Sequence, residues 1–356
     1  MSRLRIVNLL DDFALGGVTN GLKIFDSPEL QAIGDFQTVA IDANAWVAPR
    51  LAADIIITHF PPNWRRILWF HSLRLRNPKA RLIHVEHSYS RDWAELYVPN
   101  LRRFRTMMQL ALKPVDKSVV VSNALNDWLI QEKMAKAGKL QVIYPYSNIP
   151  GLADVPDIAC MPDKPLVIGA YGRFCEAKGF DRLIDAFKRT DATDNLRLVI
   201  GGFGSDEAML RTKAGDNPRI RFAGKVTDIA GFLGQCHVIA MPSRYETFGQ
   251  VANEARKAGR PILVSTVGGL PEQVGDCGVV ANCADPDMLL AALQALRAMP
   301  LEAMGRAGRM STADDRMTRA EQWRQLLQQT KPILTKRHDR PLERSQAQLD
   351  RALIRA

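Results

Sequence analysis

The sequence predicts an α/β protein of two domains, each built on a doubly wound parallel sheet. Short apolar runs alternate with segments of helical periodicity in both halves of the chain, as strands and crossover helices do in such sheets. A proline-rich stretch at residues 149–165 interrupts this alternation and has the composition of a linker. The length of 356 residues fits about two domains.

The first domain is expected to span residues 1–150 and to contain six strands. These strands are predicted at residues 4–10, 37–41, 54–58, 81–86, 117–121 and 140–143. The turn after the first strand carries Gly16 and Gly17, and a glycine pair lets a ligand or another part of the backbone approach closely. A plain flexible turn explains the pair equally well.

The second domain is expected to follow a linker at residues 151–164 and to span residues 165–312. Its alternation of apolar runs and helical segments restarts at residue 166. The end of the chain, residues 331–356, is a basic tail that is polar and rich in Arg and Gln. Such a tail could be disordered or could form a final helix.

The overall composition is ordinary for a soluble globular protein, with 46% hydrophobic and 24% charged residues. Five scattered cysteines without a C-x-x-C pair indicate neither a disulfide framework nor a zinc site, and they fit a reducing cytoplasm. The N-terminal apolar run is too short for a signal peptide and is interpreted as a strand. No run of about 20 apolar residues is present to span a bilayer. We therefore expect a cytoplasmic protein.

Much of the net charge of +10 lies in the first domain. Between Asn63 and Lys117 there are twelve Lys and Arg against four Asp and Glu, a balance of +8. Such a basic face attracts anionic lipid, polyanionic glycan or nucleic acid, and the last is not expected because no nucleic-acid-binding module is recognisable. Residues 64–76 and 101–111 mix arginines with aromatic and aliphatic side chains. Each segment could lie in a membrane interface, or could be an ordinary helix with its apolar face in the core.

Two glutamates, Glu246 and Glu254, are separated by seven residues in a segment that reads as strand, loop and helix. Glu246 falls in the loop, where the free amides of a helix N-terminus favour an anion, and Glu254 is expected about two turns further along. These amides belong to Thr247, Phe248 and Gly249. A carboxylate can accept two hydroxyl hydrogen bonds, so the pair suits a polyhydroxylated ligand that also carries phosphates. Taken alone, the spacing is more often a loop acid and a surface acid.

Two bases, Arg173 and Lys178, follow the first strand of the second domain and precede a helix. Open α/β sheets bind ligands at the carboxyl ends of their strands, and two cations there match a diphosphate. Two solvated surface bases are the alternative. A later strand ends near Val226, whose backbone could line a pocket for a nucleotide base. No G-x-G-x-x-G motif follows the first strand of the chain, which argues against a nucleotide-dependent oxidoreductase or epimerase.

The motifs of the second half occur in a defined order: G-R-F-x-x-x-K-G, G-G-x-G, F-x-G, P-S-x-x-E-x-F-G-x-x-x-x-E-A-x-x-x-G-x-P and G-G-x-P-E. This order, dense over residues 166–296, resembles the retaining nucleotide-sugar glycosyltransferases of family 4, whose GT-B architecture has two Rossmann-like domains facing a cleft. The first half matches more loosely, through Gly16-Gly17 and through His87 after a strand. Residues 313–330 resemble the final helix of the family, which crosses back to the first domain.

The resemblance implies a role for each of these residues. Arg173 and Lys178 would hold the donor diphosphate, Glu246 would bind the hydroxyls of the transferred sugar, and Glu254 would bind the ribose. His87 would lie at the reaction centre, against the sugar. The implied donor-binding set is completed by Gly16, Gly17, Val226, Thr247, Phe248 and Gly249. Neither a metal nor a cofactor is expected, because two bases already serve the phosphates.

The resemblance also implies an activity, the retaining transfer of a sugar from a UDP or GDP sugar to a glycan or a lipid-linked glycan acceptor. Synthesis of cell-surface polysaccharide or lipopolysaccharide would suit this activity. The enzyme would be cytoplasmic or peripheral on the inner face of the plasma membrane, where the basic face would meet anionic lipid. The alternative is a non-catalytic nucleotide-sugar or glycan binding protein on the same fold, against which the intact set of two bases and two glutamates argues.

Two segments depart from the family pattern. Where the family often has an Asn-Gly turn closing the first domain, this chain has Tyr-Pro-Tyr-Ser-Asn at residues 144–148. Arg256 and Lys257 replace the small residues often found behind the second glutamate. The sequence alone assigns neither segment a function.

Overall fold

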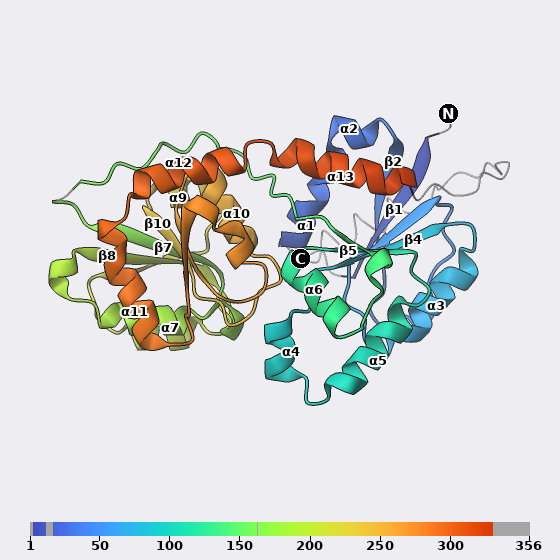
Figure 1. The fold of residues 1–356 in the computed structure, drawn as a ribbon, viewed down its shortest axis with the longest axis horizontal. Coiled ribbons are helices and arrows are strands. Elements are labelled where there is room, and N and C mark those ends of the chain that lie inside the picture. The colour runs from blue at the N-terminus through green and yellow to red at the C-terminus, as the bar shows by residue number, and fades with distance from the viewer. Residues whose placement is uncertain (1–2, 12–16, 162, 330–356) are drawn as a thin grey trace.

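Two parallel sheets of six strands each form the framework of the protein (Figure 1). The computed structural model describes residues 3–11, 17–161 and 163–329. Each sheet is surrounded by its own helices, and the two units lie side by side. The predicted α/β class with two doubly wound parallel sheets is therefore confirmed.

The first sheet has the strand order β2-β1-β3-β4-β5-β6. Its strands are β1 (Leu4–Leu10), β2 (Gly34–Ala40), β3 (Ile55–Thr58), β4 (Arg81–Glu86), β5 (Lys117–Val120) and β6 (Leu140–Val142). All six predicted strands are present, but β2 begins at Gly34 instead of residue 37. Gly34 pairs with Leu4 at the start of this strand. A Cβ on residue 34 would come within 2.7 Å of the Leu4 carbonyl oxygen, so the earlier start is possible because residue 34 is glycine.

The helices of the first domain connect these strands. They are α1 (Gly17–Leu22), η1 (Lys23–Asp26), α2 (Pro28–Gln31), α3 (Arg66–Arg76), α4 (Arg91–Tyr97), α5 (Leu101–Leu112), α6 (Asn123–Gln131) and η2 (Ala137–Lys139). Polar side chains satisfy the free amides at the starts of α4, α5 and α6. These N-caps are Ser90, Asn100 and Ser122.

The packing of helix α5 distinguishes between the two interpretations of residues 101–111, a membrane-interface segment and an ordinary amphipathic helix. Its apolar side is buried in the core of the first domain, through Phe104, Met107, Met108 and Ala111. The segment at residues 101–111 is therefore an ordinary amphipathic helix, whose apolar face is occupied by protein. Other apolar side chains of the same domain are exposed, and they include Trp46, Trp64, Leu68 and Leu75.

The second sheet has the strand order β12-β11-β10-β7-β8-β9. Its strands are β7 (Leu166–Arg173), β8 (Leu196–Phe203), β9 (Ile220–Gly224), β10 (Val238–Met241), β11 (Ile262–Ser265) and β12 (Gly278–Ala281). The α-helices of this domain are α7 (Phe180–Lys188), α8 (Glu207–Ala214), α9 (Ile229–Gly234), α10 (Gln250–Lys257), α11 (Pro286–Ala295) and α12 (Leu301–Ser311). Short 3-10 turns are η3 (Glu176–Lys178), η4 (Ala192–Asp194), η5 (Pro271–Gln273), η6 (Gly275–Cys277) and η7 (Leu296–Ala298).

The last described helix, α13 (Asp315–Gln329), leaves the second domain and packs on the first. Its buried side chains Ala320, Trp323, Leu326 and Leu327 belong to the core of the first domain. The ring of Trp323 packs edge-on against Phe25 at a centroid distance of 5.0 Å. Figure 1 shows α12 over the second domain and α13 beside α2 of the first. The chain thus crosses between the domains twice.

Some predictions concern residues that the structure does not describe. Gly16 and the tail at residues 331–356 lie outside the described residues. The exact domain boundaries remain predictions. In the described part of the chain, no helix is both long and apolar enough to cross a membrane.

Candidate active site

The predicted bases and acids come together where the two domains touch. Arg173 is the last residue of β7, Lys178 lies in η3 directly after it, and Glu246 lies in the loop that follows β10. His87 follows β4 of the first domain. The carboxyl ends of neighbouring parallel strands meet at one edge of a sheet, so residues distant in the sequence can form one site.

Two glycines let the loops of this site approach one another. Gly179 has φ +63°, and a Cβ there would lie 2.1 Å from the carbonyl oxygen of Pro242. Gly268 has φ +50°, and a Cβ there would lie 1.6 Å from the carbonyl oxygen of Glu246. Only glycine permits this combination of backbone conformation and separation. The loops that carry Lys178 and Glu246 are held in contact as a result.

Lys178 and Glu246 form an ion pair, with 2.6 Å between Nζ and Oε2. Their side chains are 25% and 14% exposed, so the pair is partly shielded from water. Burial disfavours the charged form of Lys178, but the neighbouring Glu246 carboxylate outweighs burial and raises the pKa of Lys178. Lys178 is therefore a cation at neutral pH.

Arg173 has different surroundings from Lys178. Its side chain is exposed, and among the described residues no hydrogen bond or ion pair engages its guanidinium. A guanidinium offers five donors in a planar fork that matches the oxygens of a phosphate. The end of β7 thus presents one uncompensated cation, Arg173, beside one cation that is paired with Glu246.

His87 contributes to this site from the first domain. Its Nε2 lies 2.8 Å from the carbonyl oxygen of His59, so Nε2 carries the proton and donates it. Burial lowers the pKa of His87, and the imidazole is neutral at pH 7. The hydroxyl of Thr247 donates to the carbonyl oxygen of His87 at 2.9 Å. This bond joins the loop after β10 to the first domain.

Glu254 lies in α10 and is 6% exposed. Its Oε1 accepts a hydrogen bond from the Ser147 hydroxyl at 3.1 Å, and its Oε2 accepts one from the Tyr171 hydroxyl at 2.5 Å. Burial raises the pKa of Glu254. The expected position two turns into the helix is wrong: Gly249 has a left-handed φ of +92° and α10 begins only at Gln250. Glu254 is therefore about one turn into the helix.

The other predicted donor-binding residues lie around this region. Phe248 is buried in the core of the first domain, and its ring centroid is 5.3 Å from that of Tyr144. Val226 packs beside Gly201 at the end of β8, where a Cβ on Gly201 would come within 2.4 Å of Val226 Cγ2. Gly17 begins α1 in the first domain. Binding roles for these residues remain predictions.

Glu272, to which no role is assigned from the sequence alone, makes a contact between the domains. Its carboxylate accepts hydrogen bonds from the amides of Asn123 and Ala124, at 2.9 and 2.6 Å, and from the Tyr144 hydroxyl at 2.7 Å. It thereby neutralises the N-terminus of α6, where free amides favour an anion. The G-G-x-P-E motif contains Glu272 and a predicted strand precedes Asn123, but no local pattern shows that the two residues meet.

A second group of contacts between the domains involves tyrosines. Tyr97 in α4 donates to Glu176 Oε2 at 2.8 Å, and this bond raises the pKa of Tyr97 to about 12. The rings of Tyr97 and Tyr245 pack edge-on at 5.6 Å. The Gly268 amide donates to Asp92 Oδ2 at 3.0 Å. Contacts from several elements therefore hold the domains together around Lys178 and Glu246.

Potential metal ligands are not clustered in the described residues. No group of three or more His, Cys, Asp and Glu side chains in these ranges has the arrangement that could hold a metal ion. The Asp285-Pro-Asp287 sequence instead begins α11, where Asp285 accepts hydrogen bonds from the first-turn amides. Independence from metal remains a prediction.

Comparison with known proteins relates the second domain to one family. Residues 165–298 match the model of the family described as glycosyl transferases group 1. The D-inositol 3-phosphate glycosyltransferase of Segniliparus rotundus is 33% identical over 156 residues, which are 40% of this chain and 35% of that protein. A GDP-mannose-dependent monoacylated alpha-(1-6)-phosphatidylinositol monomannoside mannosyltransferase of Corynebacterium glutamicum is 34% identical over 161 residues, 41% of this chain and 42% of that protein. The chain thus matches about two fifths of the length of these curated relatives.

Solved structures resemble nearly the whole chain. Anabaena HepE in complex with UDP and glucose has a TM-score of 0.68 at 17% identity, and the match covers 92% of this chain and 100% of that chain. WaaG, a glycosyltransferase involved in lipopolysaccharide biosynthesis, has a TM-score of 0.65 at 16% identity, with 90% and 99% covered. At these identities the likeness concerns the fold. Residues 165–298 thus resemble the glycosyl transferases group 1 family, and the chain has the GT-B fold of two Rossmann-like domains.

Proposed function

We propose that the protein is a retaining glycosyltransferase that moves a hexosyl group from a nucleoside diphosphate sugar to a glycan or lipid-linked glycan. One observation carries the proposal: the Lys178–Glu246 ion pair lies next to the uncompensated Arg173 at the contact between the domains. Cations and a carboxylate side by side suit a ligand that joins a diphosphate to a sugar. The family match over residues 165–298 supports this reading.

The chemistry needs charge stabilisation at two places. When the bond between the sugar C1 and the phosphate oxygen breaks, positive charge develops on the sugar and negative charge on the departing diphosphate. Arg173 would bind the diphosphate directly, and Lys178 would share its ammonium between a phosphate oxygen and Glu246. Cations fixed in this way stabilise the transition state more than the ground state. Glu246 would accept hydrogen bonds from sugar hydroxyls with its remaining lone pairs.

His87 would complete the site from the side of the first domain. It is neutral, its Nε2–H is engaged by His59, and its carbonyl oxygen is engaged by Thr247. These contacts fix the loop that carries His87 relative to the loop that carries Glu246. A sugar bound by Glu246 would then lie close to the loop of His87, which we propose to be at the reaction centre. Glu254 would bind the ribose.

The donor base is proposed to be uracil or guanine. Among proteins similar to this chain, a mannosyltransferase is described as GDP-mannose-dependent, and several solved structures contain UDP. No cofactor and no metal are proposed, because Arg173 and Lys178 supply the cations for the phosphates. Addition of a chelator to an active preparation tests metal independence directly.

The acceptor is proposed to be a glycan or a lipid-linked glycan of a cell-surface polysaccharide or lipopolysaccharide. The first domain offers a basic surface with exposed apolar side chains, where Arg65 lies over the ring of Trp46 and Arg103 over the ring of Trp64. Cations and indole rings together suit the headgroup region of an anionic membrane. The enzyme would then act in the cytoplasm, peripherally on the inner face of the plasma membrane.

A binding and turnover panel tests the proposal. Purified protein is titrated calorimetrically with UDP, GDP and their sugars, and the donors that bind are incubated with glycan and lipid-linked acceptors. We expect one class of nucleotide sugar to bind and to be consumed. Absence of binding to every nucleotide sugar contradicts the proposal. Binding without transfer to any acceptor favours the non-catalytic alternative.

A further inference from the structure

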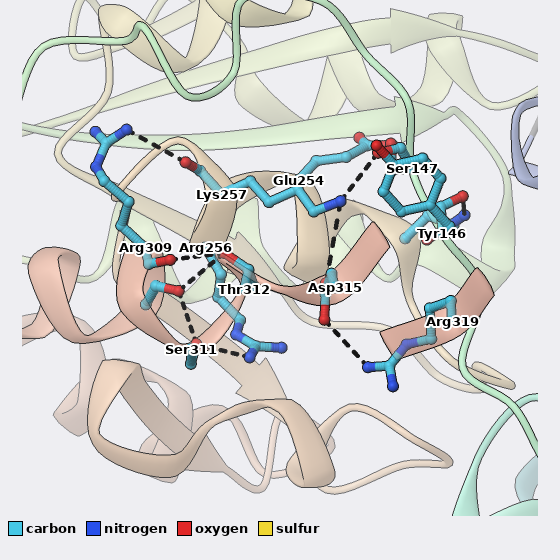
Figure 2. A network of polar contacts seen from close by, with 12 residues as sticks. Tyr146, Ser147, Glu254, Arg256, Lys257, Arg309, Ser311, Thr312, Asp315 and Arg319 are labelled. Atoms are coloured by element: carbon cyan, nitrogen blue, oxygen red, sulfur yellow. Dashed lines mark hydrogen bonds and ion pairs between the residues drawn. The ribbon is translucent and has the colours of Figure 1, made fainter. Parts of the chain in front are cut away.

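The two segments that depart from the family pattern contact each other at the junction of the domains (Figure 2). Lys257 ends α10, and its Nζ donates to the Ser147 carbonyl oxygen at 3.0 Å. The same ammonium lies 4.1 Å from the centroid of the Tyr146 ring. Gln250, at the start of α10, donates to the Tyr146 carbonyl oxygen at 3.3 Å. Lys257 therefore contacts the segment at residues 144–148 directly.

Lys257 also reaches the second crossing between the domains. Figure 2 shows its ammonium between Ser147 and Asp315. The Asp315 carboxylate, at the start of α13, lies 4.0 Å from Nζ of Lys257, and their side chains are only 11% and 13% exposed. Asp315 accepts a hydrogen bond from Arg319, whose guanidinium lies over the Tyr144 ring. One ammonium thus contacts both crossings in a place that admits little water, where charge interactions are stronger than on the surface.

Ser147 connects this contact to Glu254. Ser147 is 2% exposed, its carbonyl oxygen accepts from Lys257, and its hydroxyl donates to Glu254. Glu254 and Lys257 are three residues apart on one helix, so their side chains lie on the same face. A domain rotation that moves residue 147 must break both contacts or carry α10 with it. A carboxylate has about four acceptor sites, and the two protein bonds to Glu254 leave others for ribose hydroxyls.

We propose that Ser147 and Lys257 are positioning residues that couple nucleotide binding at Glu254 to the arrangement of the two domains. This inference rests on the proposed function, because it takes Glu254 as the carboxylate that binds the ribose. Ser147 holds the carboxylate, and Lys257 holds Ser147. A nucleotide bound to Glu254 therefore stabilises the domain arrangement in which these contacts exist. By thermodynamic reciprocity, the factor by which nucleotide favours this domain arrangement equals the factor by which the arrangement increases nucleotide affinity. A change that loosens the crossing should therefore weaken nucleotide binding.

Four variants of the full-length protein separate this coupling from a general effect on stability. Lys257→Met keeps an unbranched apolar side chain and removes the ammonium, whereas Lys257→Arg restores a cation. Ser147→Ala removes the hydroxyl that donates a hydrogen bond to Glu254. It keeps the carbonyl oxygen that accepts a hydrogen bond from Lys257. Lys213→Met is the matched control, because Lys213 forms its ion pair with Asp185 inside the second domain.

Two measurements are made on each protein. Calorimetry gives the affinity for UDP and GDP, and hydrogen exchange with mass spectrometry gives the protection of the peptide that contains residues 144–148, with and without nucleotide. In the wild type, nucleotide should slow exchange in this peptide. We expect Lys257→Met and Ser147→Ala to weaken nucleotide binding about fivefold or more, the lower end of typical couplings, and to abolish the slowing. Lys213→Met should stay within about twofold of the wild type, and Lys257→Arg should recover part of the loss.

The outcomes are distinguishable. Wild-type affinity and wild-type slowing of exchange in both Lys257→Met and Ser147→Ala overturn the coupling and leave the proposed function intact. If the wild type binds neither UDP nor GDP, the proposed function fails and the coupling fails with it. A purely structural role for Lys257 predicts faster exchange without nucleotide but an unchanged slowing by nucleotide, which also overturns the coupling. If Lys257→Met does not fold, Ser147→Ala decides the question alone.

Discussion

Nζ of Lys178 lies 2.6 Å from Oε2 of Glu246, and this ion pair joins the turn after β7 to the loop after β10. Both loops start at carboxyl ends of strands in the same sheet. Arg173, five residues before Lys178, has no comparable partner among the described residues. The site therefore has one cation that is compensated and one that is available to an anion.

The first prediction concerns the carboxylate of this pair. Glu246→Gln keeps the shape of the side chain and an oxygen that Lys178 can bind, but removes the negative charge. If Glu246 binds the sugar hydroxyls as proposed, kcat/KM for sugar transfer should fall by at least about 100-fold, the loss typical of a preorganised electrostatic contact. Initial-rate kinetics measure this effect. The matched control is Glu207→Gln, which removes an exposed acid paired with Arg211 and should retain full activity; an equally active Glu246→Gln contradicts the proposed role.

The second prediction concerns the available cation. Arg173→Ala should leave the free energy of unfolding within about 0.5 kcal/mol of the wild type, because the side chain is exposed. Binding of the nucleoside diphosphate should weaken about tenfold or more, since hydrogen bonds to charged groups contribute roughly 1.5–3 kcal/mol. Calorimetric titration with UDP and GDP provides the test, with Arg189→Ala as an exposed control. Unchanged affinity in Arg173→Ala would remove Arg173 from the site.

The third prediction concerns the contact of Glu272 with α6. Glu272→Gln replaces an anion that accepts from the Asn123 and Ala124 amides by a neutral amide, so the two domains should separate more easily. We expect a loss of roughly 1–3 kcal/mol in the free energy of unfolding. Differential scanning calorimetry should show a lower transition temperature. Glu302→Gln, which alters a bond to the Cys160 amide, is the control, and identical traces for the wild type and Glu272→Gln would contradict the prediction.

The fourth prediction concerns pH and Lys257. Burial lowers the pKa of Lys257 from 10.5 to about 8, although the carboxylates of Asp315 and Glu254 oppose this effect and Arg319 and Arg256 add to it. Between these two values the unfolded chain keeps the proton on Lys257 and the folded protein releases it. Because the unfolded state then binds more protons, the contribution of Lys257 to stability becomes more favourable as pH rises through this window.

Urea unfolding of the wild type and of Lys257→Met tests this sign. The free energy of unfolding of the wild type minus that of the variant should increase between about pH 7.5 and about pH 9.5, since only the wild type carries the shifted group. Subtracting the free energy of unfolding of the variant removes the contributions of groups that titrate in the same way in both proteins. A difference that stays constant or decreases shows that Lys257 does not have a lowered pKa.

Local sequence patterns predict the strands and the positions of the candidate site residues at the ends of these strands. The apolar run at Val238–Met241 ends at a proline, and the chain forms β10 there. Arg173 and Lys178 follow one strand and Glu246 follows another, and the family resemblance implies that all three bind one donor. The ion pair brings two of them, Lys178 and Glu246, together.

The contacts between the domains could not be read from such patterns. Glu272 and Asn123 are 149 positions apart, and Lys257 and Ser147 are 110 positions apart. Periodicity within a strand or helix contains no information about how two separately folded sheets dock. Helix α10 also begins later than predicted, because its start depends on the left-handed conformation of Gly249 and not on the apolar spacing that follows.

The stereochemistry of sugar transfer is the most direct test of the proposed activity. The wild-type protein is incubated with the nucleotide sugar that it binds and with an acceptor, and nuclear magnetic resonance identifies the anomeric configuration of the product. We expect transfer with the anomeric configuration of the donor retained, and loss of this product in Glu246→Gln. A product of inverted configuration, or no transfer from any UDP or GDP sugar, would contradict it.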